Sequence, residues 1–117
     1  MYNKSRIAID VEMDETRVPE SIQWTASETT AETSQKAKAM MLSLWDGREK
    51  TALRIDLWTK DMMLDEMADF FYQTMMTMAD SYGRATKHNE LVADMKKFAK
   101  DFYGKFQEQQ VQQNQTP

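Results

Sequence analysis

Residues 51–62 read TALRIDLWTKDM, and the period of their apolar positions changes along the run. Over the first eight residues apolar and polar side chains alternate, which is typical of a strand with one buried face. The pattern places Leu53, Ile55 and Leu57 on the inner face and Trp58 on the outer face. The residues that follow have a helical period, so a strand is predicted to lead into a helix at this junction.

The segment after the junction predicts a long helix. Asp61 is its expected N-cap, because a short side-chain oxygen can accept the free N–H groups of a first turn. The apolar residues cover about half of the helical wheel, which is wider than the stripe needed for one contact. They are Met63, Leu64, Met67, Phe70, Phe71, Thr74, Met75, Met78, Tyr82 and Ala85. This width predicts packing against both a sheet and another helix.

Two strands and a shorter helix are predicted upstream of the junction. Residues 5–13 and 22–26 each alternate, and the short polar connection between them predicts an antiparallel hairpin. Residues 35–45 carry apolar side chains at helical spacing, with Ser34 as the expected N-cap. Gly47 follows where a left-handed C-terminal cap is expected.

A last helix and a polar tail are predicted downstream. Asn89 is the expected N-cap of this helix, whose apolar stripe runs from Leu91 to Phe106. Residues 107–117 contain six glutamines, and this composition predicts disorder past the first turn.

The predicted order of elements is β-β-α-β-α-α. It predicts an α+β fold in which three helices pack mainly on one face of a small three-stranded mixed or antiparallel sheet. Residues 5–13 are expected to form the middle strand, and the strand–helix–strand connection is expected to be right-handed. Residues 1–106 are predicted to form a single domain.

The composition predicts a core built largely from methionine. Leu, Ile, Val and Phe together make up 19 of the 117 residues, whereas methionine alone contributes 11. Such a low fraction of Leu, Ile, Val and Phe is part of the compositional signature of disordered proteins. Most methionines nevertheless fall on predicted inward faces, namely Met13, Met40, Met41, Met63, Met67, Met75, Met78 and Met95. We therefore expect methionine to replace the missing aliphatic residues.

Charge and cysteine content narrow the class of function. The net charge of −4 lacks the basic footprint of a nucleic-acid-binding protein. The chain contains no cysteine, which excludes disulfides, thiolate metal sites and lipid attachment to cysteine. No run of apolar residues is long enough for a membrane span or a signal peptide. A cytoplasmic protein without a lipid anchor is the simplest expectation.

Catalytic and metal-binding motifs are missing from the sequence. His88 is the single histidine and lies in a predicted loop, where a solvated side chain is the ordinary interpretation. Asp61, Asp65 and Asp69 are each four residues apart. A solvated helix face, whose first carboxylates are favoured by the helix dipole, explains them better than a metal site. We therefore expect no enzymatic activity, no metal and no cofactor, although an enzyme that uses Asp61 or His88 remains an alternative.

Five residues are predicted to bind a protein partner. Trp58 and Lys60 belong to the apolar and charged junction after the third predicted strand, and Met62 follows them. Met76 lies on the charged side of the long helix, and Trp24 lies near the edge of the predicted hairpin. Tryptophan is enriched at interface hot spots, and methionine adapts to varied partners. Burial of Trp58 under a helix or a second copy of the chain is the alternative.

Several segments resemble the gliding motility-associated protein GldC family. They are MLSLWD (41–46), LRIDLWTKDM (53–62), DEM (65–67), FFYQT (70–74) and MADSYGRAT (78–86), and the N-terminal segments VEMDE (11–15) and VPESIQW (18–24) also look similar. The resemblance covers roughly residues 5–106. It implies a small accessory protein of the bacterial gliding machinery, whose partners are proteins of that machinery. It carries over no catalytic residues.

The sequence thus predicts a non-catalytic interaction protein associated with gliding. Two alternatives stay open. One is a domain that binds a small apolar ligand between sheet and helices, and the other is a structural homodimer without a separate ligand.

Overall fold

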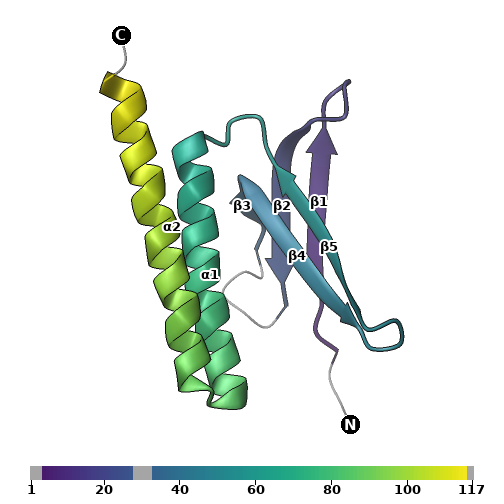
Figure 1. Cartoon of the computed structure of the whole chain (residues 1–117). Coiled ribbons are helices and arrows are strands. Elements are labelled where there is room, and N and C mark those ends of the chain that lie inside the picture. Colours follow the sequence, from purple (N-terminus) through teal and green to yellow (C-terminus); the bar gives the residue numbers. More distant parts are fainter. Residues whose placement is uncertain (1–3, 28–32, 116–117) are drawn as a thin grey trace. The chain divides into compact units, whose positions relative to one another are not determined.

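The computed structural model describes residues 4–27 and 33–115. The chain divides into two compact units, residues 1–62 and 63–117, and each is described by itself. The first unit contains five strands, which are labelled in Figure 1. They are β1 (Ile7–Met13), β2 (Pro19–Ala26), β3 (Gln35–Ala37), β4 (Ala39–Asp46) and β5 (Thr51–Trp58). The second unit contains two helices, α1 (Leu64–Thr86) and α2 (Asn89–Gln115).

The strands form two antiparallel sheets. One has the order β1-β2-β3, and the other is the hairpin of β4 and β5. The hairpin predicted between residues 5–13 and 22–26 is confirmed, since β1 pairs antiparallel with β2 and Ile9 lies opposite Trp24. The α+β class is also confirmed. The prediction of one sheet with residues 5–13 in its middle is wrong, because β2 lies between β1 and β3.

The helix predicted over residues 35–45 is wrong, because this segment forms β3 and β4. Ala37, Met40, Met41, Leu44 and Trp45 fit a helical stripe, but Met40, Leu42 and Leu44 also alternate as in a strand. Pairing with β5 over the whole of β4 decides between the two periods. Gly47 lies in the turn of this hairpin and has no positive φ; Lys50 has one, at 56°. Residues 4–27 and 33–115 therefore contain two helices rather than three. The expected strand–helix–strand crossover is not found within these ranges.

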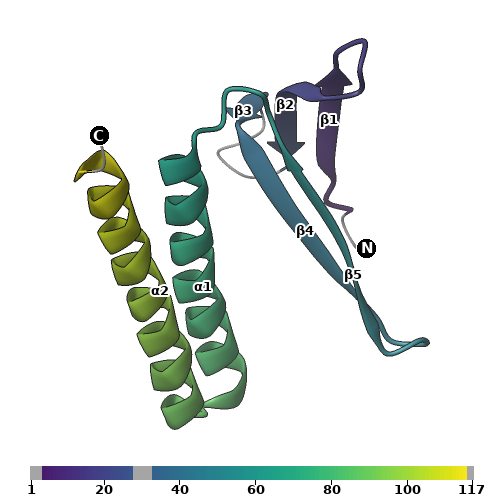
Figure 2. The ribbon, with the colours of Figure 1, turned by 45° about the horizontal axis from the view of Figure 1, so that its top comes forward.

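The turn between β4 and β5 is closed locally. The Lys50 N–H donates to the Asp46 carbonyl oxygen at 2.8 Å. The Asp46 carboxylate accepts from the backbone N–H groups of Arg48 at 2.9 Å and Glu49 at 3.2 Å. These contacts are those of an aspartate at the start of a tight turn. The hairpin it closes is long and twisted (Figure 2).

The second unit is an antiparallel pair of helices that lie side by side (Figure 1). The rings of Tyr72 on α1 and Tyr103 on α2 stack with centroids 4.9 Å apart. Ala79 and Ala99 are fully buried, which allows the two helices to approach closely. The nearest neighbour of a Cβ added at Gly83 would be Val92 Cγ2, at 3.0 Å. Small residues therefore set the spacing of the helical hairpin.

The ends of the helices differ from the prediction. The N-cap of α1 is Met63 rather than Asp61, and its N–H donates to the Glu66 carboxylate at 3.1 Å. Lys87 ends α1 in the left-handed conformation with φ of 64°. Asn89 is the first residue of α2 and not its cap. The helix α2 continues through Gln115, whereas the composition of residues 107–117 predicts disorder.

The expected methionine core is not found among the described residues. The buried apolar residues are Ile22, Ala68, Ala79 and Ala99. Met13, Met63 and Met78 are at least half exposed, and the other described methionines are half-buried. Ile22 is the one large side chain in this set. Each unit thus has a small interior, and large apolar residues lie on its surface.

Candidate protein-binding surface

The pairing of β4 and β5 sorts their side chains onto two faces. Residues directly opposite each other in an antiparallel pair share a face, and the face alternates along the strand. We define the aliphatic face as Met40, Leu42, Leu44, Leu53, Ile55 and Leu57. We define the indole face as Ala39, Met41, Ser43, Trp45, Ala52, Arg54, Asp56 and Trp58. The predicted separation of Trp58 from the three inner residues of its strand is confirmed.

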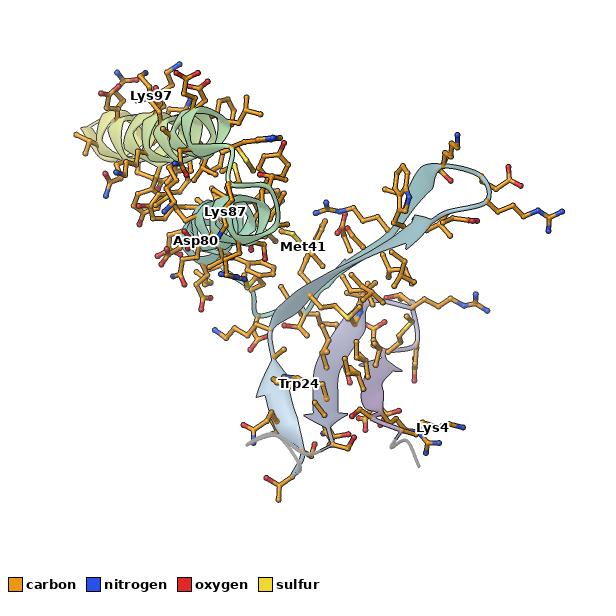
Figure 3. The ribbon with its side chains drawn as sticks, turned by 90° about the horizontal axis from the view of Figure 1, so that it is seen from below. Lys4, Trp24, Met41, Asp80, Lys87 and Lys97 are labelled. Carbon is orange, nitrogen blue, oxygen red and sulfur yellow. The ribbon has the colours of Figure 1, made fainter. Side chains whose placement is uncertain are left out.

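Both faces of this ribbon expose large apolar side chains. Trp45 is 69% exposed and Trp58 is 54% exposed, at opposite ends of the indole face. Leu44, Leu53 and Ile55 on the aliphatic face are each more than half exposed. Side chains stand out on either side of the ribbon in Figure 3, where Met41 is labelled. An isolated two-stranded ribbon is marginally stable in water, so such surfaces indicate further contacts.

A charged pair lies between the two indoles. The Arg54 Nε donates to Asp56 Oδ1 at 2.8 Å and to Oδ2 at 3.0 Å. The Arg54 Nη2 lies 3.0 Å from the sulfur of Met41 on the neighbouring strand. These contacts hold the guanidinium in place on the indole face. Tryptophan, methionine and arginine are the residue types enriched in protein interfaces, and this face combines all three.

Beyond Trp58 the chain is held firmly by hydrogen bonds. Thr59 is buried, and its N–H donates to the carbonyl oxygen of Lys38 at 2.7 Å. Its hydroxyl lies 2.9 Å from the same oxygen and 2.6 Å from the Asp61 carboxylate. The hydroxyl holds the pKa of Asp61 below its ordinary value. Asp61 therefore fixes the end of β5 rather than starting α1.

Lys60 is paired within the first unit. Its ammonium forms ion pairs with Asp14 and, at 3.3 Å, with Glu20, both near the turn between β1 and β2. The two carboxylates raise the pKa of Lys60, with Asp14 as the larger cause. The ammonium in turn holds the pKa of Asp14 far below its ordinary value. Lys60 thus connects the end of β5 to the β1–β2 hairpin, which orients Trp58.

The other predicted site residues fall in different surroundings. Met62 is half-buried and follows this junction in the first unit. Trp24 is half-buried on β2, the middle strand, opposite Ile9 and Gln35, so it does not lie at a sheet edge (Figure 3). Met76 is half-buried on α1, in the second unit. Trp58, Lys60 and Met62 are thus neighbours in sequence, and Lys60 is paired with Asp14 and Glu20.

His88, Asp61, Asp65 and Asp69 are not members of the indole face. The Tyr82 hydroxyl and His88 Nδ1 are 2.9 Å apart, and both belong to the helical hairpin. Asp65 lies in the first turn of α1, whereas Asp61 precedes that helix. Over residues 4–27 and 33–115 no group of three or more histidine, cysteine, aspartate or glutamate side chains is arranged to hold a metal ion. No helix in these ranges is long and apolar enough to cross a membrane.

The helical hairpin has surface hollows of its own. One, of about 370 Å³, follows α2 and is lined by Phe98, Asp101, Phe102, Lys105, Phe106 and Gln109. Another, of about 700 Å³, is lined by Thr77, Met78, Asp80, Ser81, Tyr82, Arg84 and Met95. Asp80 and Lys97, labelled in Figure 3, lie on α1 and α2. A small apolar ligand between sheet and helices stays a prediction.

Comparison with known proteins assigns the chain to a family. The sequence model described as gliding motility-associated protein GldC-like matches residues 19–108. The chain belongs to the GldC-like family. The resemblance seen in the sequence is thereby confirmed. Searches of curated proteins and of solved structures return no significant match.

The family match covers the whole of the ribbon in this GldC-like chain. It begins at the first residue of β2, includes β3, β4, β5 and α1, and ends within α2. The family's description associates the chain with gliding motility. Trp45, Met41 and Arg54 belong to the indole face but were not among the residues predicted to bind a partner. Alternation of Met41, Ser43 and Trp45 ahead of Asp46 was the available signal, because it marks the first strand of a hairpin.

Proposed function

We infer that this GldC-like chain is a non-catalytic accessory protein that binds a protein of the gliding machinery through the indole face. The observation that carries this proposal is the pair of exposed indoles, Trp45 and Trp58, on one face of a ribbon. Exposed tryptophans on a common face are costly in water unless a partner covers them.

The local structure supports an interaction role. The ion pair of Arg54 and Asp56 supplies orientation without a strong net charge, and Met41 supplies an adaptable apolar contact. The fixed junction at Thr59 and Lys60 limits the motion of Trp58. An indole held in place in advance loses less conformational entropy on binding than a mobile one.

Removal of the Trp58 side chain is expected to weaken partner binding strongly. Truncation of a hot-spot tryptophan commonly costs about 2 kcal/mol or more of binding free energy, so retention should fall by roughly thirtyfold. Tagged wild type, Trp58→Ala and Val111→Ala would be used to capture partners from a gliding bacterium that expresses a GldC-like protein. Val111 is the matched control, because it is an apolar residue of similar exposure at 53% on α2.

The expected result is a gliding protein retained by wild type and Val111→Ala and lost with Trp58→Ala. Equal retention by all three proteins would refute the role of the indole face. Equal loss from both variants would attribute the effect to exposed apolar residues in general.

A further inference from the structure

The outer edge of β5 pairs with no other strand within residues 4–27 and 33–115. Among the described residues β5 pairs with β4 alone, and it contains neither proline nor glycine. The Thr59 N–H points toward β4 and donates to the carbonyl oxygen of Lys38. Along a strand, the main-chain N–H and C=O groups of successive residues point to alternate edges. The main-chain groups that face the open edge are therefore those of Ala52, Arg54, Asp56 and Trp58. An unpaired strand edge of this length is one that proteins usually cover or blunt.

The sequence of β5 is self-complementary about Ile55. If a second β5 runs antiparallel with its Ile55 opposite the first, Arg54 lies opposite Asp56 and Leu53 lies opposite Leu57. Ala52 lies opposite Trp58, so a small residue faces a large one. Opposite charges directly across an antiparallel pair stabilise it, and like charges destabilise it.

The two adjacent two-fold registers fail this test. A two-fold axis at Arg54 would place the two arginines opposite each other, and an axis at Asp56 would do the same to the two aspartates. Along β4, residues 39–45 carry no charge, so nothing on that strand sets a register. The charges along β5 thus favour a second β5 as the partner strand, aligned with Ile55 opposite Ile55.

We propose that two copies of this chain pair through their β5 edges, antiparallel, around a two-fold axis at Ile55. The product is a continuous sheet in the order β4-β5-β5-β4, with Arg54 and Asp56 of the two copies forming a square of alternating charges. A symmetric interface that uses the same patch on both subunits is the commonest form of homodimer. This inference goes beyond the proposed function, since partner binding does not require two copies.

Pairing also joins the faces defined above. The two aliphatic faces become one, with Ile55 of both copies at its centre, and the two indole faces lie together on the opposite side. Ile55 belongs to the pairs that are not hydrogen-bonded across the axis, where Cα atoms approach to about 4.5 Å. A dimer would therefore present two copies of the partner-binding surface.

Single cysteines test the register directly, because the chain has no cysteine of its own. Two Cys at position 55 would lie within disulfide reach, so Ile55→Cys is expected to cross-link at least about tenfold faster than Leu53→Cys. Leu53 is the matched control, because it shares the face and the exposure of Ile55. Its two copies would lie about 14 Å apart along the paired strands.

Charge reversal gives an independent measurement. The wild type is expected to have twice the 13.7 kDa chain mass in light scattering. Arg54→Asp and Asp56→Arg should each be monomeric, because each places like charges across the axis, and their equimolar mixture should restore the dimer. Circular dichroism would establish that each variant is folded.

Three results would overturn the proposal. The first is a monomeric wild type at about 100 μM, because an interface of micromolar affinity is largely occupied at that concentration. The second is equal cross-linking of the two cysteine variants, and the third is failure of the mixture to dimerise. None of these outcomes affects capture of a gliding protein through Trp58, so the proposed function would fail separately.

Discussion

Replacement of Ile22 by alanine is expected to lower the free energy of unfolding of the first unit by about 2–5 kcal/mol. Ile22 is 1% exposed and is the one large, fully buried side chain among the described residues. Truncation leaves a cavity at the centre of the β1-β2-β3 sheet. In so small an interior no other side chain of similar size can replace the lost contacts.

Urea unfolding followed by tryptophan fluorescence measures this effect. All three tryptophans lie in residues 1–62, so their emission reports on this unit. Ile7→Ala is the matched control, because Ile7 is 74% exposed and its truncation should change the free energy by less than about 0.5 kcal/mol. Equal destabilisation by both variants would contradict the position of the core.

Enlargement of Ala79 to leucine is expected to destabilise the helical hairpin by about 1–3 kcal/mol or more. Ala79 is fully buried in a helical hairpin whose helices approach each other at small residues. A longer side chain forces α1 and α2 apart and breaks the close contacts around Tyr72 and Tyr103.

Thermal unfolding followed by the helical circular dichroism signal tests this expectation. Ala85→Leu is the control on the same helix, because Ala85 is exposed and leucine there keeps a high helix propensity. A stable Ala79→Leu protein with an unchanged melting temperature would show that the interface between the helices is not closely packed.

Much of the fold follows from local pattern. The period of β1, of β5 and of α1 is unambiguous over seven or more residues, and the structure has each element close to its predicted bounds. The family assignment was also available from the sequence, because every quoted segment except VEMDE (11–15) lies within or largely within the matched range 19–108.

The segment 35–46 could not be assigned from local pattern alone. Its apolar residues fit both periods, and Ser34 and Gly47 imitate the caps of a helix. Pairing with β5 decides the structure, and that pairing is a contact between distant residues rather than a local preference. The Asp46-Gly47 pair between two apolar runs is the turn signal that favours the hairpin.

The same error hid part of the candidate site. A helical interpretation of residues 35–45 separated Trp45 from Trp58, whereas the strands place both on the indole face. The pairing of Lys60 with Asp14 depends on the closeness of segments that are more than forty residues apart, which no motif indicates. The outer orientation of Trp58 was predictable, because alternation within one strand fixes it.

Colony spreading measures whether the indole face acts in gliding. A gliding bacterium would carry Trp45→Ala together with Trp58→Ala in its own GldC-like protein, beside a strain with Val111→Ala, each variant being present at the wild-type level. We predict that the double variant spreads far less than wild type and that Val111→Ala spreads normally. Normal spreading of the double variant, with the protein folded and present, would contradict the account.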